Sequence, residues 1–426
     1  MVERVTQRTS GVAAKQGLFF FVMLSCLYFA QGLPFGLLAK ALPALARDAG
    51  LSRLYIGLLA LPAAPWALKF VWAPWVDKWG AGKGSHRKRW IISCQLIAVL
   101  LLGWVACQDQ QALLTERWWL LLLVLTLLNA VCATQDIATD GLAARYLPLA
   151  ARGLGNSIQV MGYKIGLILG GASVLMLVSA LGWLLTFLVA AVLLLCLLLP
   201  LLLWREPIDE PLMAAPQTTP WAEWLASVLP LFRQPGMLIW LLVLMGYKTG
   251  EDFATHMVKP WLVDQGWSLA AIGRLDLVAG LLSLLAALLC GVMLRFFRRS
   301  RLLLAFALLQ VTVVLCWALV TLYEADVSVV WSVAIFQQSV GSMAAVVLFT
   351  VMMDRCRRGH EGADFTVQAS VQLSVAGLFV LASGASAHWL GYVGHFALGT
   401  LLALAVILPI LLLPDSFDRP AHANRQ

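Results

Sequence analysis

The chain has 426 residues, of which 61% are hydrophobic and only 12% are charged, and its mean hydropathy is +0.85. Such values exclude a soluble two-domain protein of this length and indicate an integral membrane protein. The net charge of +8 could suggest nucleic-acid binding, but the basic residues lie in short loops on alternate sides of apolar segments, as the positive-inside rule describes.

Apolar windows of about 20 residues, the length that crosses a bilayer, recur along nearly the whole chain. They predict an all-α polytopic membrane protein, because lipid cannot satisfy exposed backbone polar groups and the alternating pattern of a membrane β-barrel is absent from the sequence. The twelve predicted spans are residues 17–41, 53–76, 90–107, 118–145, 153–178, 182–204, 237–262, 269–295, 301–322, 328–352, 364–388 and 391–413. The basic loops follow even-numbered spans, so we expect these loops and both termini to face the cytoplasm.

The loop after the second span combines an acid at a helix end with a cluster of basic residues, in the sequence "APWVDKWGAGKGSHRKRW" (residues 73–90). It resembles the loop signature of major facilitator transporters, in which an acid and basic residues latch neighbouring helix ends on the cytoplasmic side. The match is partial, because Ala73 replaces the usual glycine and the corresponding loop of the second half has Arg295 in place of the acid. A simple topology loop is the alternative. The gate candidates are Asp77, Gly80, Arg87, Lys88, Arg89 and, from span eleven, Asp364.

Span four carries two carboxylates in an otherwise apolar run. Asn129, Asp136 and Asp140 are spaced i, i+7 and i+11, which places them on one helical face. An ionised group at the bilayer centre costs roughly 2.5–3.5 kcal/mol, so each needs a partner or an aqueous cavity. We expect Asp136 in the translocation path, paired with Lys164 or Lys248. Asp140 has the alternative of a solvated cytoplasmic end or a pair with Arg145 or Arg152.

Span five contains "GNSIQVMGYKIGLILGG", which places Gln159 and Tyr163 on one face beside Lys164. Its glycines repeat every four residues, a pattern that lets helices approach closely.

The polar interval at residues 205–236 predicts a cytoplasmic linker between six-helix bundles at residues 1–204 and 237–426, the second ending in a short cytoplasmic tail. A repeat supports the division: "DAGLSRLYIG" (48–57) and "DQGWSLAAIG" (264–273) occupy equivalent places in the two halves. Parallel six-helix repeats with pseudo-twofold symmetry are typical of the major facilitator fold and imply alternating access between the bundles.

Span seven contains "GYKTGEDFATHMVKPW", where Lys248, Asp252, Thr255 and Lys259 form one stripe. The alternatives are a cavity lining and an internal ion-pair ladder of Lys248 with Asp252 or Glu251, and the two are compatible. In span eleven, Asp364, Gln368 and Gln372 share a face, which predicts either a cavity wall or a solvated helix start.

The complete set of site candidates has two groups. The cavity-lining candidates are Tyr28, Gln31, Lys69, Asn129, Gln159, Tyr163, Lys164, Tyr247, Lys248, Thr255, His256, Lys259, Gln368 and Gln372, and the proton-coupling candidates are Asp136, Asp140, Glu251 and Asp252. Lys69 lies among Trp66, Phe70 and Trp72 and could snorkel or pair with an acid. We expect no catalytic residue, metal site or cofactor, since the histidines are dispersed and the eight cysteines form no C-x-x-C pair.

The runs "TQDIATDG" (134–141), "RGLGNSIQVMGYKIG" (152–166) and "GYKTGEDF" (246–253) resemble the AmpG-like branch of the major facilitator superfamily. Within it, "YFAQGLPFGLLAKALPALARDAG", "APWALKFVWAPWVD" and "GADFTVQAS" are similar to the RhtX/FptX-type siderophore permeases, a group that includes the yersiniabactin-associated permease.

The resemblance implies a secondary transporter of the bacterial inner membrane that moves a metallophore or its iron or zinc complex inward, coupled to protons. It also implies a monomer without nucleic-acid partners. The alternatives are export of the metallophore, a muropeptide-like or drug-like cargo, and a non-transporting receptor or scaffold.

Overall fold

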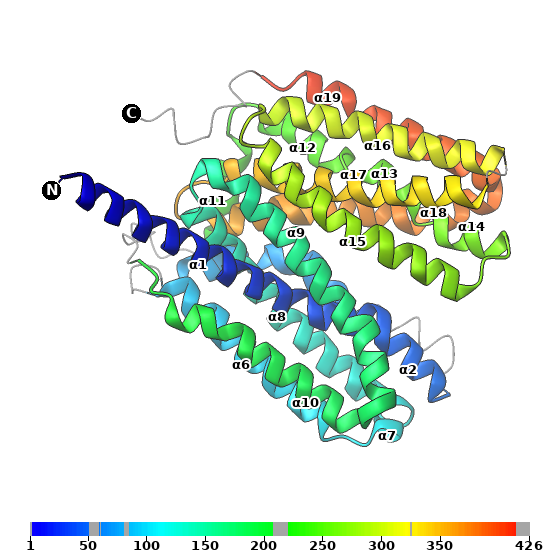
Figure 1. Cartoon of the computed structure of the whole chain (residues 1–426), viewed down its shortest axis with the longest axis horizontal. Coiled ribbons are helices and arrows are strands. Elements are labelled where there is room, and N and C mark those ends of the chain that lie inside the picture. Colours follow the sequence, from blue (N-terminus) through cyan, green and yellow to red (C-terminus); the bar gives the residue numbers. More distant parts are fainter. Residues whose placement is uncertain are drawn as a thin grey trace. The chain divides into compact units, whose positions relative to one another are not determined.

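The computed structural model describes residues 2–50, 59, 61–80, 85–207, 220–323 and 326–414, and every regular element in these ranges is helical (Figure 1). The chain forms two compact units. Unit 1 comprises Met1–Tyr146, Met161–Thr218 and Gly359–Ala363, and unit 2 comprises Leu147–Val160, Thr219–Arg358 and Asp364–Gln426. Each unit therefore contains a short segment from the other half of the sequence.

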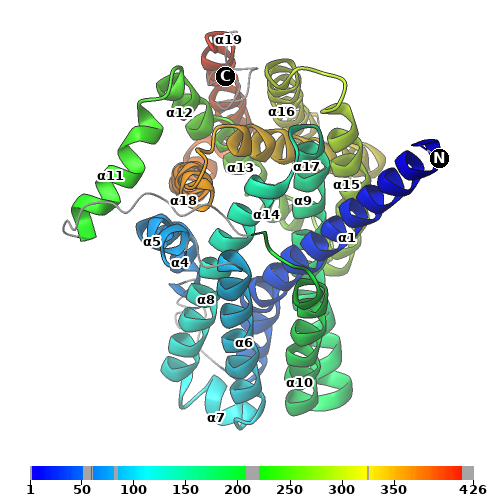
Figure 2. The same ribbon diagram turned by 90° about the vertical axis from the view of Figure 1, so that its left-hand side faces the viewer.

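Unit 1 is a bundle in which α6 packs against α8 and α10, and α1 packs against α8 and α10 (Figure 2). Its core is apolar and includes Leu102, Leu125 and Phe187. Its elements are α1 (Val2–Gly36), η1 (Leu37–Ala41), α2 (Leu42–Asp48), η2 (Leu61–Ala63), α4 (Ala64–Leu68), η3 (Lys69–Val71), α5 (Ala73–Lys78), α6 (His86–Ala106), α7 (Gln110–Leu114), α8 (Trp118–Tyr146), the second part of α9 (Arg152–Ile168), η5 (Leu169–Ser173) and α10 (Val174–Leu203).

In unit 2, α17 packs against α15 and α16 around a core that includes Trp261, Trp317 and Phe396. Its elements are η4 (Leu149–Ala151), the first part of α9, α11 (Pro220–Phe232), α12 (Met237–Gly246), α13 (Thr249–Thr255), α14 (Val258–Asp264), α15 (Leu269–Met293), α16 (Arg299–Leu322), α17 (Val327–Asp354), α18 (Glu361–Ala405) and α19 (Ile407–Leu411).

Among the described residues, eight helices are long and apolar enough to cross a membrane, or nine if α11 and the bent stretch Met237–Asp264 count as one span. Two long elements include parts of two predicted spans each. Gly182 interrupts α10 with φ 79° and ψ 175°, and Gly391 interrupts α18 with φ 67° and ψ 174°. These glycines are the first residues of predicted spans six and twelve. The count of twelve stays a prediction.

Two predicted spans differ from continuous helices. Span two consists, in its described part, of the short segments η2, α4, η3 and α5, because Pro62, Pro65 and Pro74 remove backbone donors and favour helix starts. Span seven is divided into α12, α13 and α14, with Lys248 and Met257 at the two junctions. The stripe expected from a 3.6-residue period is therefore interrupted.

Several predictions fall outside the described residues. Most of the repeat at 48–57, the loop residues 81–84 and the linker residues 208–219 lie there, as do residues 415–426. The predicted domain boundaries stay predictions.

Candidate functional site

The first candidate site is a buried cluster of charged and polar groups in unit 1, between α1, η3 and α8. Lys69 Nζ forms an ion pair with Asp136 Oδ2, and the two side chains are 7% and 9% exposed. One turn along α8, Asp140 is 1% exposed and its Oδ1 accepts a hydrogen bond from the Tyr28 hydroxyl at 3.0 Å. One cation, Lys69, thus acts on two buried carboxylates.

Indole groups from the second predicted span complete this cluster. The Lys69 ammonium lies 5.6 Å from the Trp66 ring centroid, within cation–π range. Trp66 Nε1 donates to Asn129 Oδ1 at 2.9 Å, and Trp72 Nε1 donates to Thr134 Oγ1 at 3.0 Å. These indoles therefore fix the short helices of span two against the polar face of α8.

Two sequence predictions about α8 are corrected here. The ion pair of Asp136 is to Lys69 and not to Lys164 or Lys248, because the prolines of span two place Lys69 beside α8. Asp140 is 1% exposed, so the alternative of a solvated cytoplasmic end is wrong for this residue, while Arg145 and Arg152 form ion pairs with Glu361 and Asp354. Asn129, on the same face of α8, is fully buried as well.

Unit 2 contains a second ion-pair cluster, at the junction of α12 and α13, in which Glu251 is buried and Lys248 and Asp252 are half-buried. Lys248 Nζ forms an ion pair with Glu251 Oε2 and lies 3.9 Å from Asp252 Oδ1. With its amide oriented to satisfy its neighbours, Gln310 donates to Glu251 Oε2 at 2.8 Å and to the Tyr247 carbonyl at 3.1 Å. The ion-pair ladder proposed from sequence is confirmed, and again one lysine serves two carboxylates.

The rest of the span-seven stripe does not join this cluster. Lys259 Nζ pairs with Asp276 Oδ2 at 2.9 Å, and the lysine side chain is 59% exposed. Gln338 Nε2 also donates to Asp276, at 3.1 Å. His256 is exposed and Thr255 is half-buried. The helix breaks directly after them, at Met257, so Lys259 belongs to the separate helix α14.

The remaining cavity candidates are dispersed. Gln31 and Gln159 are buried, whereas Tyr163, Lys164 and Gln372 are half-buried. The Tyr163 ring lies 6.2 Å from Phe35 between centroids. Gln368 is fully buried and accepts from Trp240 Nε1 at 2.7 Å, so the alternative of a solvated helix start is wrong for this residue.

The loop signature after span two forms the expected latch within unit 1. Arg87 Nη2 lies 3.4 Å from Asp77 Oδ1 and 2.9 Å from Glu361 Oε2, and Arg145 Nη1 pairs with Glu361 Oε1 at 3.0 Å. Asp77 Oδ2 also accepts the backbone N–H of Ala363 at 2.6 Å. The latch therefore holds the beginning of α18.

The other gate candidates have separate places. Gly80 has φ 97°, a conformation that favours glycine, and Arg89 is exposed. Lys88 Nζ donates to the carbonyls of Leu202 and Trp204, at 2.8 and 2.5 Å. Asp364 pairs with Arg357 at 2.5 Å within unit 2, and Glu361 is the acidic residue of α18 in the latch with Arg87.

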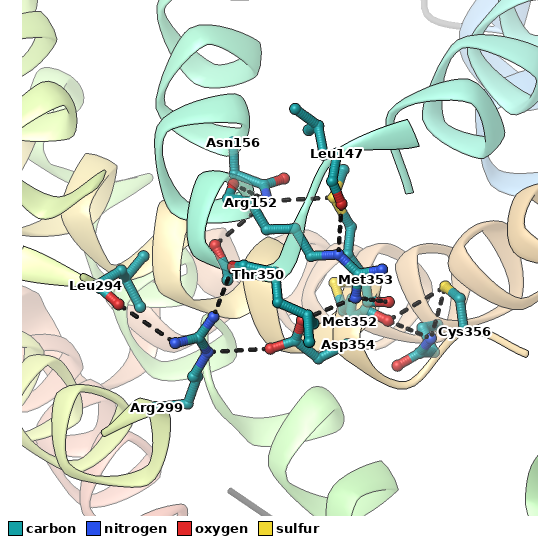
Figure 3. Close-up of polar contacts among 12 residues, drawn as sticks. Leu147, Arg152, Asn156, Leu294, Arg299, Thr350, Met352, Met353, Asp354 and Cys356 are labelled. Atoms are coloured by element: carbon teal, nitrogen blue, oxygen red, sulfur yellow. Dashed lines mark hydrogen bonds and ion pairs between the residues drawn. The ribbon is translucent and has the colours of Figure 1, made fainter. Parts of the chain in front are cut away.

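Sequence reasoning missed Glu361 and a second ion-pair network in unit 2, shown in Figure 3. Arg152 Nη1 and Arg299 Nε contact the two oxygens of Asp354, at 2.8 and 3.0 Å. The available signal for Glu361 was an acid at a helix start close to the basic run Arg355, Arg357 and Arg358, but its partners are 216 and 274 residues distant in the chain. Such pairings have no local sequence pattern.

The comparisons with known proteins agree with this architecture. The family model described as Major Facilitator Superfamily matches residues 24–379. The chain belongs to the major facilitator superfamily. This protein is therefore a multi-pass membrane transporter for small molecules, and its family provides no evidence for enzymatic activity.

Two curated relatives are informative. The anhydromuropeptide permease of Escherichia coli (strain K12) is 27% identical over 396 residues, which cover 90% of this chain and 78% of the relative. A protein of Rickettsia felis named putative transporter AmpG 4 is 24% identical over 270 residues, 61% of this chain and 63% of that protein. These relatives support the AmpG-like branch of the superfamily.

The solved structure of the major facilitator transporter FucP in its outward conformation has a TM-score of 0.72 and 14% identity, and the match covers 92% of this chain and 98% of that one. This likeness supports the fold.

Proposed function

We propose that this major facilitator protein is a proton-coupled secondary transporter of the bacterial inner membrane, and that the Lys69–Asp136–Asp140 cluster holds the coupling proton. The observation that carries the proposal is the imbalance of buried charge. One lysine and two carboxylates sum to +1 − 2 = −1 when all three are ionised. Two carboxylate charges side by side in a dry site repel one another at a high cost, so a proton held by the carboxylates relieves this repulsion.

The cluster also has a means of responding to that proton. When both carboxylates are charged, Lys69 and the Tyr28 hydroxyl are needed to stabilise them. When one carboxylate is protonated, only one negative charge is left for Lys69 to stabilise, and the cluster of Lys69, Asp136 and Asp140 is neutral overall. A change in protonation thus alters the contacts between α1, η3 and α8, which can bias the equilibrium of alternating access.

The cargo that we propose is a metallophore or its iron or zinc complex, moved inward. The support is the resemblance of the segments at residues 28–50, 64–77 and 362–370 to siderophore permeases. A muropeptide-like solute is the second candidate, because the permease that is 27% identical over 90% of this chain is named for anhydromuropeptides.

A binding experiment on purified full-length protein separates these cargoes. The ligands are a yersiniabactin-type metallophore, free and as its iron and zinc complexes, and an anhydromuropeptide, each titrated by calorimetry. We expect saturable binding of the metallophore or one of its complexes. Binding of the anhydromuropeptide alone would replace the first candidate with the second.

Transport in proteoliposomes tests the coupling. An Asp140→Asn variant should lose accumulation driven by a pH gradient but retain counterflow of preloaded substrate, since exchange requires no net proton movement. One coupled charge supports a concentration ratio of roughly fifty-fold per 100 mV, which the variant should reduce to about one. Asp109→Asn, at an exposed loop residue of unit 1, is the control. Wild-type accumulation with unchanged pH dependence in Asp140→Asn would refute the coupling role.

A further inference from the structure

Unit 2 contains a pocket of about 530 Å³ apart from the lysine clusters. This volume lies within the range of about 300–1,000 Å³ typical of ligand pockets. It is formed by the α8–α9 connection, the end of α15, the start of α16 and the end of α17. Its lining residues are Pro148, Leu149, Ala150, Ala151, Leu294, Arg295, Arg299 and Asp354.

The charge of this pocket is positive. Its lining contains two arginines, Arg295 and Arg299, and one carboxylate, Asp354, a formal charge of +2 − 1 = +1. Both oxygens of Asp354 are already in contact with Arg152 and Arg299 (Figure 3). Arg299 is held in place by further donation to the carbonyls of Leu294 and Leu149, at 3.3 and 3.1 Å. Arg295 lines the same pocket, is exposed and makes no ion pair with the part of the chain that the structure describes. An anion is therefore the complementary ligand.

The N-terminus of α16 adds to this preference. The helix begins at Arg299, and its N-cap residue Arg298 provides no side-chain cap to the first backbone N–H groups. The positive end of the helix dipole thus lies beside the pocket arginines.

The surroundings favour a lipid over a free anion. Phe296 and Phe297, directly after Arg295, are 77% and 51% exposed, and Leu149 is 41% exposed. The pocket lies where the long apolar helices α15 and α16 meet their connecting loop, at the level where a bilayer changes from acyl chains to headgroups. Basic pockets between helices at this level bind anionic headgroups.

We propose that this pocket binds the phosphate headgroup of an anionic phospholipid. Arg295 and Arg299 contact the phosphate, while the exposed phenylalanines contact the acyl chains. The pocket shares no residue with the proposed coupling cluster of Lys69, Asp136 and Asp140. Lipid binding and proton-coupled transport can therefore be measured, and can fail, independently.

Native mass spectrometry of the full-length protein tests the proposal, with phosphatidylglycerol, phosphatidylcholine and inorganic phosphate as probes. We expect phosphatidylglycerol to bind and the other two not to displace it. Arg295→Gln should weaken this binding roughly fivefold, the effect of about one surface charge on an anionic lipid. This variant leaves the contacts of Asp354 intact and should fold normally.

The matched control is Arg301→Gln, which removes the same charge from an exposed residue of α16 outside the pocket lining. Equal loss of binding in both variants would show that the lipid is attracted by the basic charge of this region as a whole, and it would refute a specific site in this pocket. Displacement by inorganic phosphate at equal concentration would show a free-anion site and would overturn the lipid assignment. Equal binding of phosphatidylcholine would overturn the role of headgroup charge.

Discussion

At the scale of single residues, the Lys69 ammonium stabilises the charge of a carboxylate that is buried inside unit 1. Lys69 and Asp136 are each less than a tenth exposed, so neither has water to stabilise its charge alone. Removing one partner of a buried ion pair leaves the other charge buried without it, whereas removing both leaves only the Asp140 carboxyl, whose Oδ1 accepts from the Tyr28 hydroxyl. The two residues should therefore behave as a unit in stability measurements.

We expect Lys69→Met to lower the free energy of unfolding by about 3–5 kcal/mol, the usual cost of breaking a buried pair. The double variant Lys69→Met with Asp136→Leu should recover most of this loss. Unfolding in mixed micelles, followed by tryptophan fluorescence, gives the comparison. Additive losses in the two single variants would mean that the side chains do not interact.

At the scale of elements, glycines determine how closely α1 and α9 approach within unit 1. A Cβ atom on Gly166 would lie 2.3 Å from the Phe29 carbonyl oxygen, and one on Gly170 would lie 1.9 Å from the Leu33 carbonyl oxygen. Both neighbours are backbone atoms and cannot rotate away. The packing role predicted for the glycines of span five is thus confirmed.

Gly166→Ala should consequently destabilise the protein by about 1–3 kcal/mol, as overpacking does elsewhere. Gly103→Ala on α6 is the matched control, because a Cβ there meets nothing within 4 Å and should stabilise the helix by up to about 1 kcal/mol. Thermal unfolding of both variants in the same detergent measures the difference. A similar melting temperature for both would contradict the close-contact explanation.

The latch is also a property of elements, since an acid near the end of α5 holds the start of α18. Asp77 accepts the Ala363 N–H at 2.6 Å, and a hydrogen bond to a charged group contributes about 1.5–3 kcal/mol. In Asp77→Asn we expect the amides of residues 361–363 to exchange roughly tenfold to hundredfold faster. Hydrogen-exchange mass spectrometry reports this directly, with Asp109→Asn as control. Unchanged protection would show that neighbouring contacts suffice.

At the scale of the whole molecule, basic loops predict topology. The loops after even-numbered predicted spans carry the arginine and lysine clusters, and they predict cytoplasmic termini. A green fluorescent protein fused to the C-terminus should fluoresce, and alkaline phosphatase fused there should be inactive. Alkaline phosphatase fused within residues 107–117 should be active. The reverse result would invert the membrane orientation and place the proposed lipid site on the opposite leaflet.

Much of the fold is determined by local sequence. Long apolar runs require helices because lipid provides no backbone partners, and this holds whatever the helices pack against. The same reasoning predicts that Asp136 and Lys248 need a partner or an aqueous cavity, whereas for Asp140 it leaves the alternative of a solvated helix end. Prolines, visible in the sequence, interrupt span two.

Only the tertiary structure decides the partners. Lys69 pairs with an acid 67 residues away, and Glu361 pairs with Arg87 across 274 residues. Helical periodicity assigns a residue to a face of its own helix, but it contains no information on which other helix covers that face. A buried charge can be satisfied by any opposite charge within reach, so the sequence by itself determines that a partner must exist, and packing alone selects which one it is.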